Sequence, residues 1–366
     1  MAGYDSPLIL EVKVTESFPK KRATLQDVAR AAGVGPMTVS RTINGHPYVA
    51  QETARKVQEA IRLLDYRPNH AARMLTGKLS RSIGLIVPDI SDTFFSVVSH
   101  AVQEAARENG YLVWLAASDE DPSIEEAQVE MMMHHPVDGI LLVPCDSRAK
   151  YLKSIASGRT PVVTIDRPME VATTDSVGVE NRAGAVMAVE HLLEHGYRRI
   201  VCVSANSHLL TIKERITGYR EAMRRAGLPV LKEANLPTRA AAHQILSEML
   251  SGPDRPDAIF AANNASTIWV IECLRERNLE LGRDVALVGF DDVDFFTLIT
   301  PSVTAVRQPS AELGKVSARL LLQRINGEFQ TSSVRTVLPV TLTIRESCGC
   351  RSGERSNSGR EAGAAG

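Results

Sequence analysis

Apolar residues recur at helical spacing in a short segment near the N-terminus, where Leu25 and Ala32 fall on one face. A polar cap precedes this segment, because the Thr24 hydroxyl can accept from free N–H groups and Asp27 follows three positions later, as in a capping box. Gly33 ends the pattern, since glycine adopts a positive φ at little cost. The sequence therefore predicts a helix between Thr24 and Gly33.

Two further helices are predicted after the first. Pro36 suits the first turn of a helix because its missing N–H leaves no bond unmade, and Val39 then points inward. A third helix, predicted over residues 51–64, carries Ile61 on its apolar stripe. Pro68 ends this three-helix unit.

From residue 82 the pattern changes to short apolar runs separated by helical stretches. The runs typical of buried strands are residues 82–88, 111–116, 138–144, 160–166, 198–204, 256–263 and 284–292. Alternation of strand and helix over about 250 residues favours parallel sheets covered by helices. Such a run is long for one sheet, so we expect two α/β lobes.

Composition limits the class of protein. The chain has 366 residues, of which 44% are hydrophobic, so two or three compact units are expected. No stretch approaches the roughly 18 uninterrupted apolar residues of a membrane span, and the short run at residues 8–10 lacks the basic start of a secretory signal. Five cysteines suggest no disulfide framework, and we expect a cytoplasmic protein.

The net charge of −1 hides an asymmetry along the chain. Residues 20–81 hold 12 Lys and Arg against 4 Asp and Glu, whereas the remainder holds 30 basic and 39 acidic residues. A basic block ahead of an acidic body is typical of a head that binds phosphates. A solvated basic tail is the alternative, but the apolar periodicity of the block disfavours it.

Several motifs occur in a fixed order along the chain. They read DVARAAGVGPMTVSR at 27–41, YRPNHAARML at 66–75, IVPDISDTFF at 86–95 and VGFDD at 288–292. With these motifs the chain resembles the lactose/galactose-repressor (LacI/GalR) family of bacterial transcription regulators over about residues 24–347. The resemblance implies an all-α helix-turn-helix domain followed by an α/β periplasmic-binding-protein-like core of two doubly wound lobes.

The resemblance also implies a domain order. We expect a disordered extension at 1–20, a helix-turn-helix domain at 21–67, a hinge helix and linker at 68–81, an effector-binding and dimerisation domain at 82–347, and a disordered tail at 348–366. Within the large domain, we expect the first lobe to hold about 82–194 and 309–336, and the second about 195–306 and 337–347.

A helix-turn-helix lays its second helix in the major groove of DNA. The resemblance places Pro36, Met37 and Arg41 against bases, and Arg41 can fork to a guanine, which is worth about 1–3 kcal/mol of discrimination. A phosphate contact is the alternative for Arg41, and a plain surface position is the alternative for Ser40. The DNA-contacting residues we predict are Thr24, Pro36, Met37, Thr38, Ser40, Arg41, Asn44, Asn69, Ala72, Arg73 and Leu75.

Residues 69–76 resemble the family's hinge helix, which is too short to be stable alone. The resemblance implies that two hinges pair in the minor groove and lever Leu75 between base pairs; packing of Leu75 within a linker is the alternative. Two hinges require a homodimer on a near-palindromic site, and a tetramer stays open. Ala50 departs from the family, which usually has a capping Ser or Thr there.

The resemblance places a small-molecule effector between the lobes, where the C-terminal ends of the strands meet. Arg215 and Asp291 match charged ligand contacts, although Asp291 could instead cap a helix, and one of Phe94 and Phe95 could belong to the core. The effector-binding residues we predict are Phe94, Phe95, Asn181, Thr211, Arg215, Asn263 and Asp291.

Departures near this site bear on the ligand. Asp92 and Thr93 replace a frequent Asn-Pro, and Asn264 stands where Asp is common. Leu209 occupies a position that is basic in purine-responsive relatives, so a sugar or sugar derivative is favoured over a nucleobase. A non-sugar metabolite or a protein partner as the controlling ligand, and a cytosolic solute-binding protein, remain the alternatives.

The chain shows no G-x-S-x-G, Walker or G-x-G-x-x-G motif, so we expect no enzyme and no cofactor. His191 and His195 stand one helical turn apart without an evident third ligand, and surface histidines are the preferred interpretation. Cys348 and Cys350 could bind a metal or oxidise, but we predict no metal. The expected protein is a repressor that binds double-stranded DNA under effector control.

Overall fold

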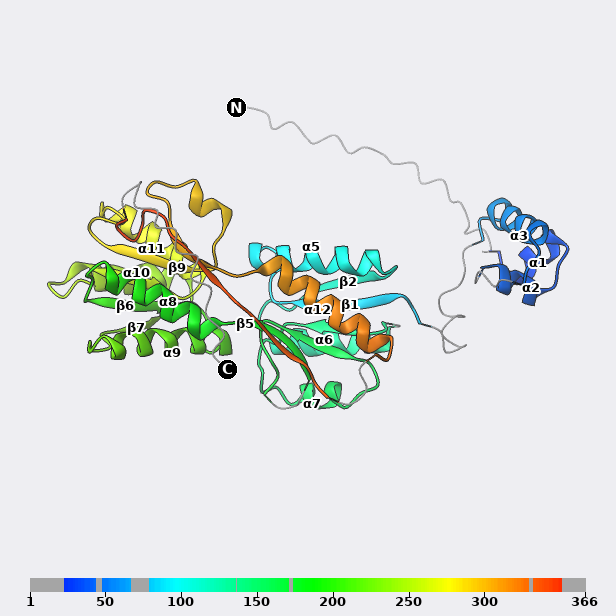
Figure 1. Cartoon of the computed structure of the whole chain (residues 1–366), viewed down its shortest axis with the longest axis horizontal. Coiled ribbons are helices and arrows are strands. Elements are labelled where there is room, and N and C mark those ends of the chain that lie inside the picture. The colour runs from blue at the N-terminus through cyan, green and yellow to red at the C-terminus, as the bar shows by residue number, and fades with distance from the viewer. Residues whose placement is uncertain are drawn as a thin grey trace, which may run out of the picture. The chain divides into compact units, whose positions relative to one another are not determined.

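The computed structural model describes residues 23–43, 48–66, 79–135, 137–170, 174–328 and 332–350 (Figure 1). The chain divides into two compact units, residues 1–78 and 79–366. Five of the predicted DNA-contacting residues lie outside the described residues: Asn44, Asn69, Ala72, Arg73 and Leu75.

The first unit is a bundle of three short helices, α1 (Leu25–Ala32), α2 (Pro36–Ile43) and α3 (Gln51–Leu63). Its core is made of Val28, Val39 and Val57, one from each helix, and all three side chains are fully buried. This confirms the apolar stripes that the sequence predicts for these three helices.

The predicted cap of α1 is present in full. The Asp27 backbone N–H donates to Thr24 Oγ1 over 3.3 Å, and the Thr24 backbone N–H donates to Asp27 Oδ2 over 2.9 Å. Gly33 ends the helix with φ of 68°, a conformation that costs glycine little. In contrast, α3 begins after Ala50 with no side-chain hydrogen bond to its first turn.

The second unit contains two six-stranded sheets, one in each lobe. The first, wholly parallel sheet has the order β11-β5-β4-β3-β1-β2, with strands β1 (Ser82–Val87), β2 (Leu112–Ala117), β3 (Ile140–Leu142), β4 (Val162–Ile165), β5 (Asp175–Val179) and β11 (Arg335–Leu338). The second has the order β12-β10-β9-β8-β6-β7, with strands β6 (Ile200–Ser204), β7 (Glu233–Asn235), β8 (Ala258–Ala261), β9 (Ala286–Phe290), β10 (Thr304–Arg307) and an antiparallel β12 (Thr341–Thr343).

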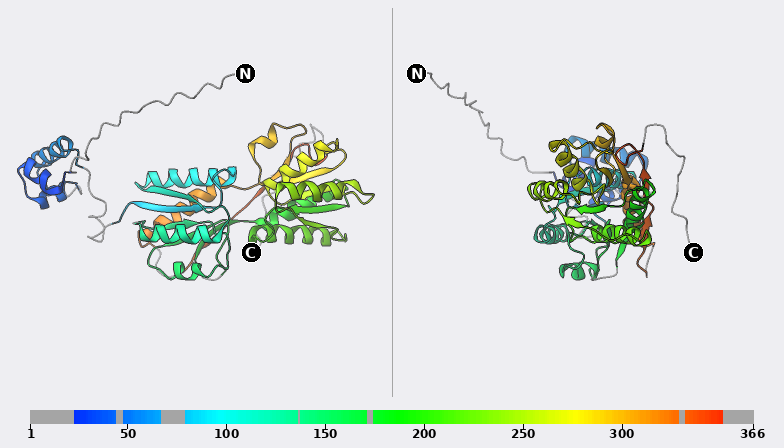
Figure 2. Two further views of the ribbon diagram at one scale, coloured as in Figure 1. Left: turned by 180° about the vertical axis from the view of Figure 1, so that it is seen from behind. Right: turned by 90° about the vertical axis from the view of Figure 1, so that its left-hand side faces the viewer.

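Helices cover both faces of each sheet (Figure 2). The first lobe has α5 (Thr93–Glu108) and α12 (Ser310–Ile325) on one face, with α6 (Pro122–His134) and α7 (Tyr151–Ala156) on the other. The second has α8 (Asn181–Glu194) and α9 (Leu210–Arg225) on one face, with α10 (Arg239–Ser251) and α11 (Asn264–Glu276) on the other; a 3₁₀ turn follows at Asp294–Thr297. Among the described residues, no helix is both long and apolar enough to span a membrane.

Each lobe holds one helix pair that approaches closely at a glycine. A Cβ at Gly218 of α9 would lie 2.4 Å from the Arg182 carbonyl oxygen of α8, and a Cβ at Gly314 of α12 would lie 2.5 Å from the Val98 carbonyl oxygen of α5. The two backbones can come this near only because glycine has no side chain.

The chain crosses between the lobes three times: between β5 and α8, between β10 and α12, and between β11 and β12. The sequence predicts that the first lobe continues to about residue 194, but α8 belongs to the second lobe. A Cβ at Gly184 of α8 would meet Val340 at 2.7 Å and Phe290 at 3.0 Å, so this helix packs on the second sheet. The predicted tail boundary at 348 is also too early, because Cys348 is fully buried.

Candidate functional site

The described part of the first unit presents one face of α2 to solvent. Pro36, Met37 and Arg41 are exposed, with 66% of the Met37 surface accessible, whereas Val39 is fully buried beneath them. Thr38 and Ser40 are half-buried. The residues predicted to read bases therefore share the accessible side of one helix, and their contact with DNA stays a prediction.

Thr24 has a structural role in addition to its predicted DNA contact. Its hydroxyl donates to Asp27 Oδ2 over 2.7 Å while serving as the cap of α1. The sequence alone suggested both roles, and the geometry accounts for the cap.

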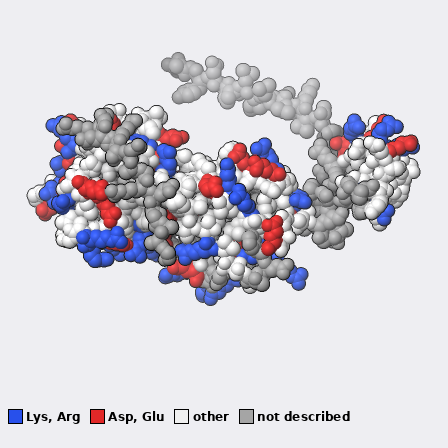
Figure 3. Space-filling view, viewed as in Figure 1, with Lys and Arg blue, Asp and Glu red and all other residues white. Residues whose placement is uncertain are grey.

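The positive charge of the head is concentrated outside its described helices. Residues 23–43 and 48–66 hold five basic and four acidic residues, so they account for little of the excess between residues 20 and 81. Figure 3 accordingly shows Lys and Arg interspersed with Asp and Glu on the visible face of both units. The excess of positive charge between residues 20 and 81 therefore lies mainly in the sequence on either side of the three helices.

In the second unit, Arg215 of α9 joins residues from three parts of the chain. Its Nε donates to Asn181 Oδ1 over 2.8 Å, and its Nη1 donates to Asp291 Oδ2 over 3.1 Å and to the Ala262 carbonyl over 2.9 Å. The guanidinium also stacks on the Phe290 ring, 3.7 Å from its centre. Arg215 is only 3% exposed, so these contacts hold one fixed orientation.

Asp291 is positioned by the backbone as well as by its partners. It follows β9 with φ of 73°, in the left-handed region, and its carboxylate accepts from both Arg215 and Gln308. The alternative that Asp291 caps a helix does not hold, since the following 3₁₀ turn is preceded by Val293 without a side-chain cap.

Three residues that the sequence analysis missed complete this region: Asp166, Arg167 and Gln308. Asp166 directly follows β4 with φ of 65°, and Arg167 Nε lies 3.5 Å from its Oδ2. Gln308 follows β10 and reaches Asp291. We refer to Asp166, Asn181, Arg215, Asp291 and Gln308 as the interlobe polar cluster.

Buried polar atoms of this region lack hydrogen-bond partners within the described structure. They are Asp166 Oδ1, Arg167 Nε and Gln308 Oε1. Buried polar groups are nearly always hydrogen-bonded in folded proteins. These unpaired donors and acceptors could therefore form hydrogen bonds with a small ligand that is rich in hydroxyl groups.

The lobes also meet through a contact between Asp92, the N-cap of α5, and Asn264, the first residue of α11. Asn264 Nδ2 lies 3.1 Å from Asp92 Oδ1 and 3.2 Å from Oδ2. Burial raises the pKa of Asp92, and the negative charge of Asp291 raises it further. Burial likewise raises the pKa of Asp166, against the opposing effect of Arg167 and Arg215.

The other predicted effector residues have mixed surroundings. Phe95 belongs to the core and Phe94 is half-buried against it, with ring centres 5.0 Å apart. Asn263 caps α11 through its side-chain oxygen, which accepts from the Ser266 N–H over 3.1 Å. Thr211 is buried in the first turn of α9. Their contact with an effector remains a prediction.

Two cavities lie in this part of the second unit; the lining of the first includes Arg167 but none of the interlobe polar cluster, and that of the second includes Asp166 and Asn181. One, of about 370 Å³, lies between the lobes and is lined by Glu120 and Arg167 from the first lobe and by Leu209 and Lys213 from the second. Arg167 is fixed there by a double hydrogen bond to Glu120, of 2.9 and 2.7 Å. This cavity is large enough for a small sugar.

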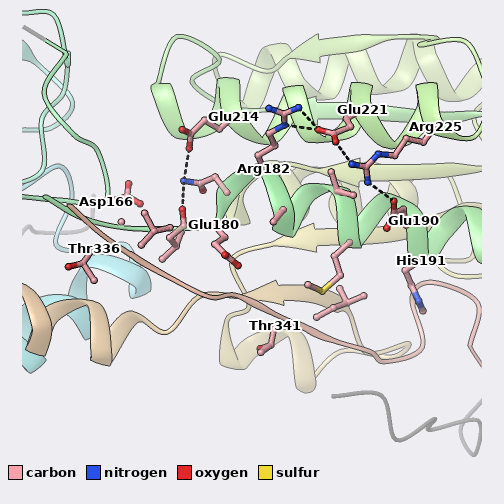
Figure 4. A pocket seen from close by; sticks show the side chains of 18 of the residues that line it. Asp166, Glu180, Arg182, Glu190, His191, Glu214, Glu221, Arg225, Thr336 and Thr341 are labelled. Atoms are coloured by element: carbon pink, nitrogen blue, oxygen red, sulfur yellow. Dashed lines mark hydrogen bonds and ion pairs between the residues drawn. The ribbon is translucent and has the colours of Figure 1, made fainter. Parts of the chain in front are cut away.

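The second cavity is a groove of about 1270 Å³ along α8 and the crossing strands β5, β11 and β12. Figure 4 shows its wall of alternating charges, in which Arg182 pairs with Glu221, and Arg225 pairs with both Glu221 and Glu190. Asn181 lies at its edge and donates to Glu214 over 3.2 Å. The groove therefore adjoins the segments that connect the lobes.

Two family models match this chain. "Bacterial regulatory proteins, lacI family" matches residues 24–69, and "Periplasmic binding protein-like domain" matches residues 189–348. The HTH-type transcriptional regulator DegA of Bacillus subtilis (strain 168) is 31% identical over 331 residues, which cover 89% of this chain and 98% of that relative.

Solved structures of bacterial transcription regulators are also similar to this chain. The complex of the transcriptional regulator CelR with cellobiose is 32% identical, with a TM-score of 0.67, over 89% of this chain and all of that one (100%). The lac repressor dimer bound to operator and the anti-inducer ONPF is 25% identical, with a TM-score of 0.80, over 90% of this chain and 99% of that one.

Proposed function

The chain belongs to the LacI family of bacterial regulatory proteins, and we propose from this premise that it is a cytoplasmic repressor whose operator affinity is set by a sugar bound between its lobes. It is a DNA-binding transcriptional regulator with a helix-turn-helix head. We infer a homodimer on a near-palindromic operator, because a two-fold protein matches a two-fold site and the similar lac repressor binds its operator as a dimer.

The observation that carries the effector proposal is the interlobe polar cluster. A buried guanidinium and a half-buried carboxylate, with polar atoms beside them that lack partners, match the alternating donors and acceptors of a sugar ring. The CelR structure contains cellobiose, which supports a carbohydrate as the ligand class. We infer no catalytic step, in keeping with the regulators among its relatives.

Control of DNA binding follows from where the ligand would be held. Asp166 belongs to the first lobe and Arg215 and Asp291 to the second, so a ligand that contacts all three binds more tightly when the lobes are closed. Only such a difference in affinity between two arrangements shifts their populations. The shift would change the geometry of the paired heads and thereby operator affinity.

Base reading is tested with the full-length protein and a duplex selected from a pool of random near-palindromic sequences. We expect Arg41→Ala to weaken binding of the selected duplex by about 5- to 150-fold, which corresponds to about 1–3 kcal/mol. The control is Arg62→Ala, an exposed arginine of α3. Equal losses in both variants would contradict the assignment of Arg41 to a base.

Effector binding is tested by calorimetry with ribose, cellobiose and a panel of other sugars and sugar acids. We expect one of them to bind the wild-type protein and to lose at least tenfold in affinity with Asp291→Asn, but not with Asp254→Asn at an exposed position. Failure of every carbohydrate, with a positive result from another metabolite or a protein partner, would reject the sugar proposal.

A further inference from the structure

The C-terminal end of α8 and the segment after β12 bring two imidazoles and two thiols together. Cys350 Sγ lies 3.1 Å from His195 Nε2 and 3.9 Å from His191 Nε2, and Cys348 Sγ lies 3.2 Å from Cys350 Sγ. One ligand atom from each of the four side chains lies within 4.8 Å of all the others. The third and fourth ligands that the histidines lack in the local sequence therefore come from residues 153 to 159 positions further along the chain.

Local backbone geometry holds each half of this group. His191 and His195 stand one turn apart on α8, with ring centres 4.6 Å apart. The two cysteines flank Gly349, whose φ is 89°, and a Cβ there would lie 2.5 Å from Tyr197 Oη. Glycine is required both for this turn and for the close approach, so the chain can aim both thiols at α8.

We propose that His191, His195, Cys348 and Cys350 bind one zinc ion. Zinc–sulfur bonds of about 2.3 Å and zinc–nitrogen bonds of about 2.0–2.1 Å, arranged tetrahedrally, place ligand atoms roughly 3.3–3.8 Å apart. The spacings of 3.1, 3.2 and 3.9 Å between neighbouring ligand atoms already approach this geometry. Binding requires both thiols to become thiolates and releases two protons to solvent.

The donor set selects the metal. Two thiolates with two imidazoles suit a borderline-soft ion in a tetrahedral site, whereas calcium and magnesium prefer oxygen. All four positions are filled by the chain, which is the arrangement of a structural rather than a catalytic zinc site. Thiolate charge and metal charge balance, so even the fully buried Cys348 can take part.

A neighbouring hydroxyl supports Cys348 as a thiolate. Thr304 Oγ1 accepts the Arg345 backbone N–H over 2.8 Å, which leaves its proton directed to Cys348 Sγ at 3.2 Å. Hydrogen bonds of this kind orient a ligand and stabilise its charge. The metal would join α8 to the segment after β12 and so stabilise the second lobe, independently of DNA or effector.

The test uses full-length protein that has been fully reduced, stripped with a chelator and titrated with cobalt(II) and then with zinc(II). We expect one equivalent of cobalt per chain, with tetrahedral ligand-field bands and thiolate charge-transfer absorption, and displacement by zinc. Zinc should also raise the melting temperature of the stripped wild-type protein. Zinc content of the protein as purified, measured by mass spectrometry, gives a second readout.

Variants locate the metal. His195→Ala, at an exposed position that tolerates truncation, and Cys350→Ser should each abolish the cobalt spectrum and the zinc-dependent rise in melting temperature. His100→Ala on α5 and Cys273→Ser on α11 should keep both. Lack of uptake by the reduced wild-type protein overturns the proposal, as does uptake that persists in His195→Ala and Cys350→Ser. Formation of a Cys348–Cys350 disulfide that zinc does not prevent in air also overturns it.

Discussion

Asp92 and Asn264, which are 172 positions apart in the chain, are hydrogen-bonded across the two lobes over 3.1 Å. The resemblance to the family implies Asn at the first position and Asp at the second. In this chain the carboxylate instead lies at the start of α5 and the amide at the start of α11, and the two side chains are hydrogen-bonded to each other.

We expect the Asp92–Asn264 bond to contribute about 1 kcal/mol to the free energy of unfolding, less than a fully buried bond to a charged group. A double-mutant cycle with Asp92→Ala and Asn264→Ala, measured by urea unfolding, isolates this value from the loss of the α5 cap. Asp121→Ala, which removes the N-cap of α6, should be additive with Asn264→Ala. If the losses in free energy of unfolding caused by Asp92→Ala and Asn264→Ala are additive, the hydrogen bond between the lobes does not contribute to stability.

Gly218→Ala should destabilise the second unit by about 1–3 kcal/mol, because the new methyl group would lie 2.4 Å from a backbone oxygen of α8. Separation of α9 from α8 would also lengthen the bond between Arg215 and Asn181. The measurement is thermal unfolding of the full chain. Gly252→Ala serves as the control, since the nearest atom there is 3.9 Å away; equal effects at both positions would refute the packing explanation.

Ala50→Ser should stabilise α3 by about 1 kcal/mol, because the new hydroxyl supplies the hydrogen bond that this helix start lacks. Hydrogen exchange of the peptide that covers residues 51–63 reports on this helix without interference from the larger unit. Ala50→Val, a poor capping residue, should give no slower exchange than wild type. Protection that is identical in Ser and Val variants would be against the capping explanation.

Asp166→Asn should change the pH dependence of stability. The folded pKa of Asp166 is raised by burial, so wild-type stability falls as pH rises from about 4, the unfolded value, through the folded value. The amide of the variant cannot ionise, so its free energy of unfolding should not decrease over this pH range. The difference from wild type should be smallest at acidic pH, where Asp166 is protonated. Urea unfolding at a series of pH values measures the difference. Asp254→Asn is the matched control, and a variant curve parallel to that of wild type would contradict the prediction.

The fold could be predicted wherever the hydrophobic pattern is compatible with only one type of element and one buried face. The three head helices follow directly from periodicity, because each has a single apolar face. Seven strands coincide with predicted apolar runs, although β2 is largely exposed, whereas the predicted runs do not include β5, β7, β10, β11 and β12. The placement of α8 was not predictable in this way. Its buried face combines the apolar Ala185, Val189 and Leu192 with small or polar residues such as Gly184 and His191, so the pattern indicates a helix without indicating which sheet it covers.

The site shows the same division. Asp166 is the last residue of a predicted strand. Because the C-terminal ends of parallel strands face the ligand cleft, this position could have identified Asp166 as a cleft residue from the sequence alone. Gln308 has no comparable signal. It reaches Asp291 only because β10 lies beside β9, with Val306 opposite Phe290, and that pairing is a tertiary result rather than a local pattern.

Three is an odd number of passages between the lobes, so the chain enters the body in one lobe and leaves it in the other. The DNA-reading unit precedes β1 and is therefore covalently continuous with the first lobe alone. Effector binding to the second lobe must therefore displace the first lobe before it can change the affinity for DNA. Mutations that stiffen the three segments that connect the lobes should uncouple effector binding from the change in operator affinity, while both binding activities remain.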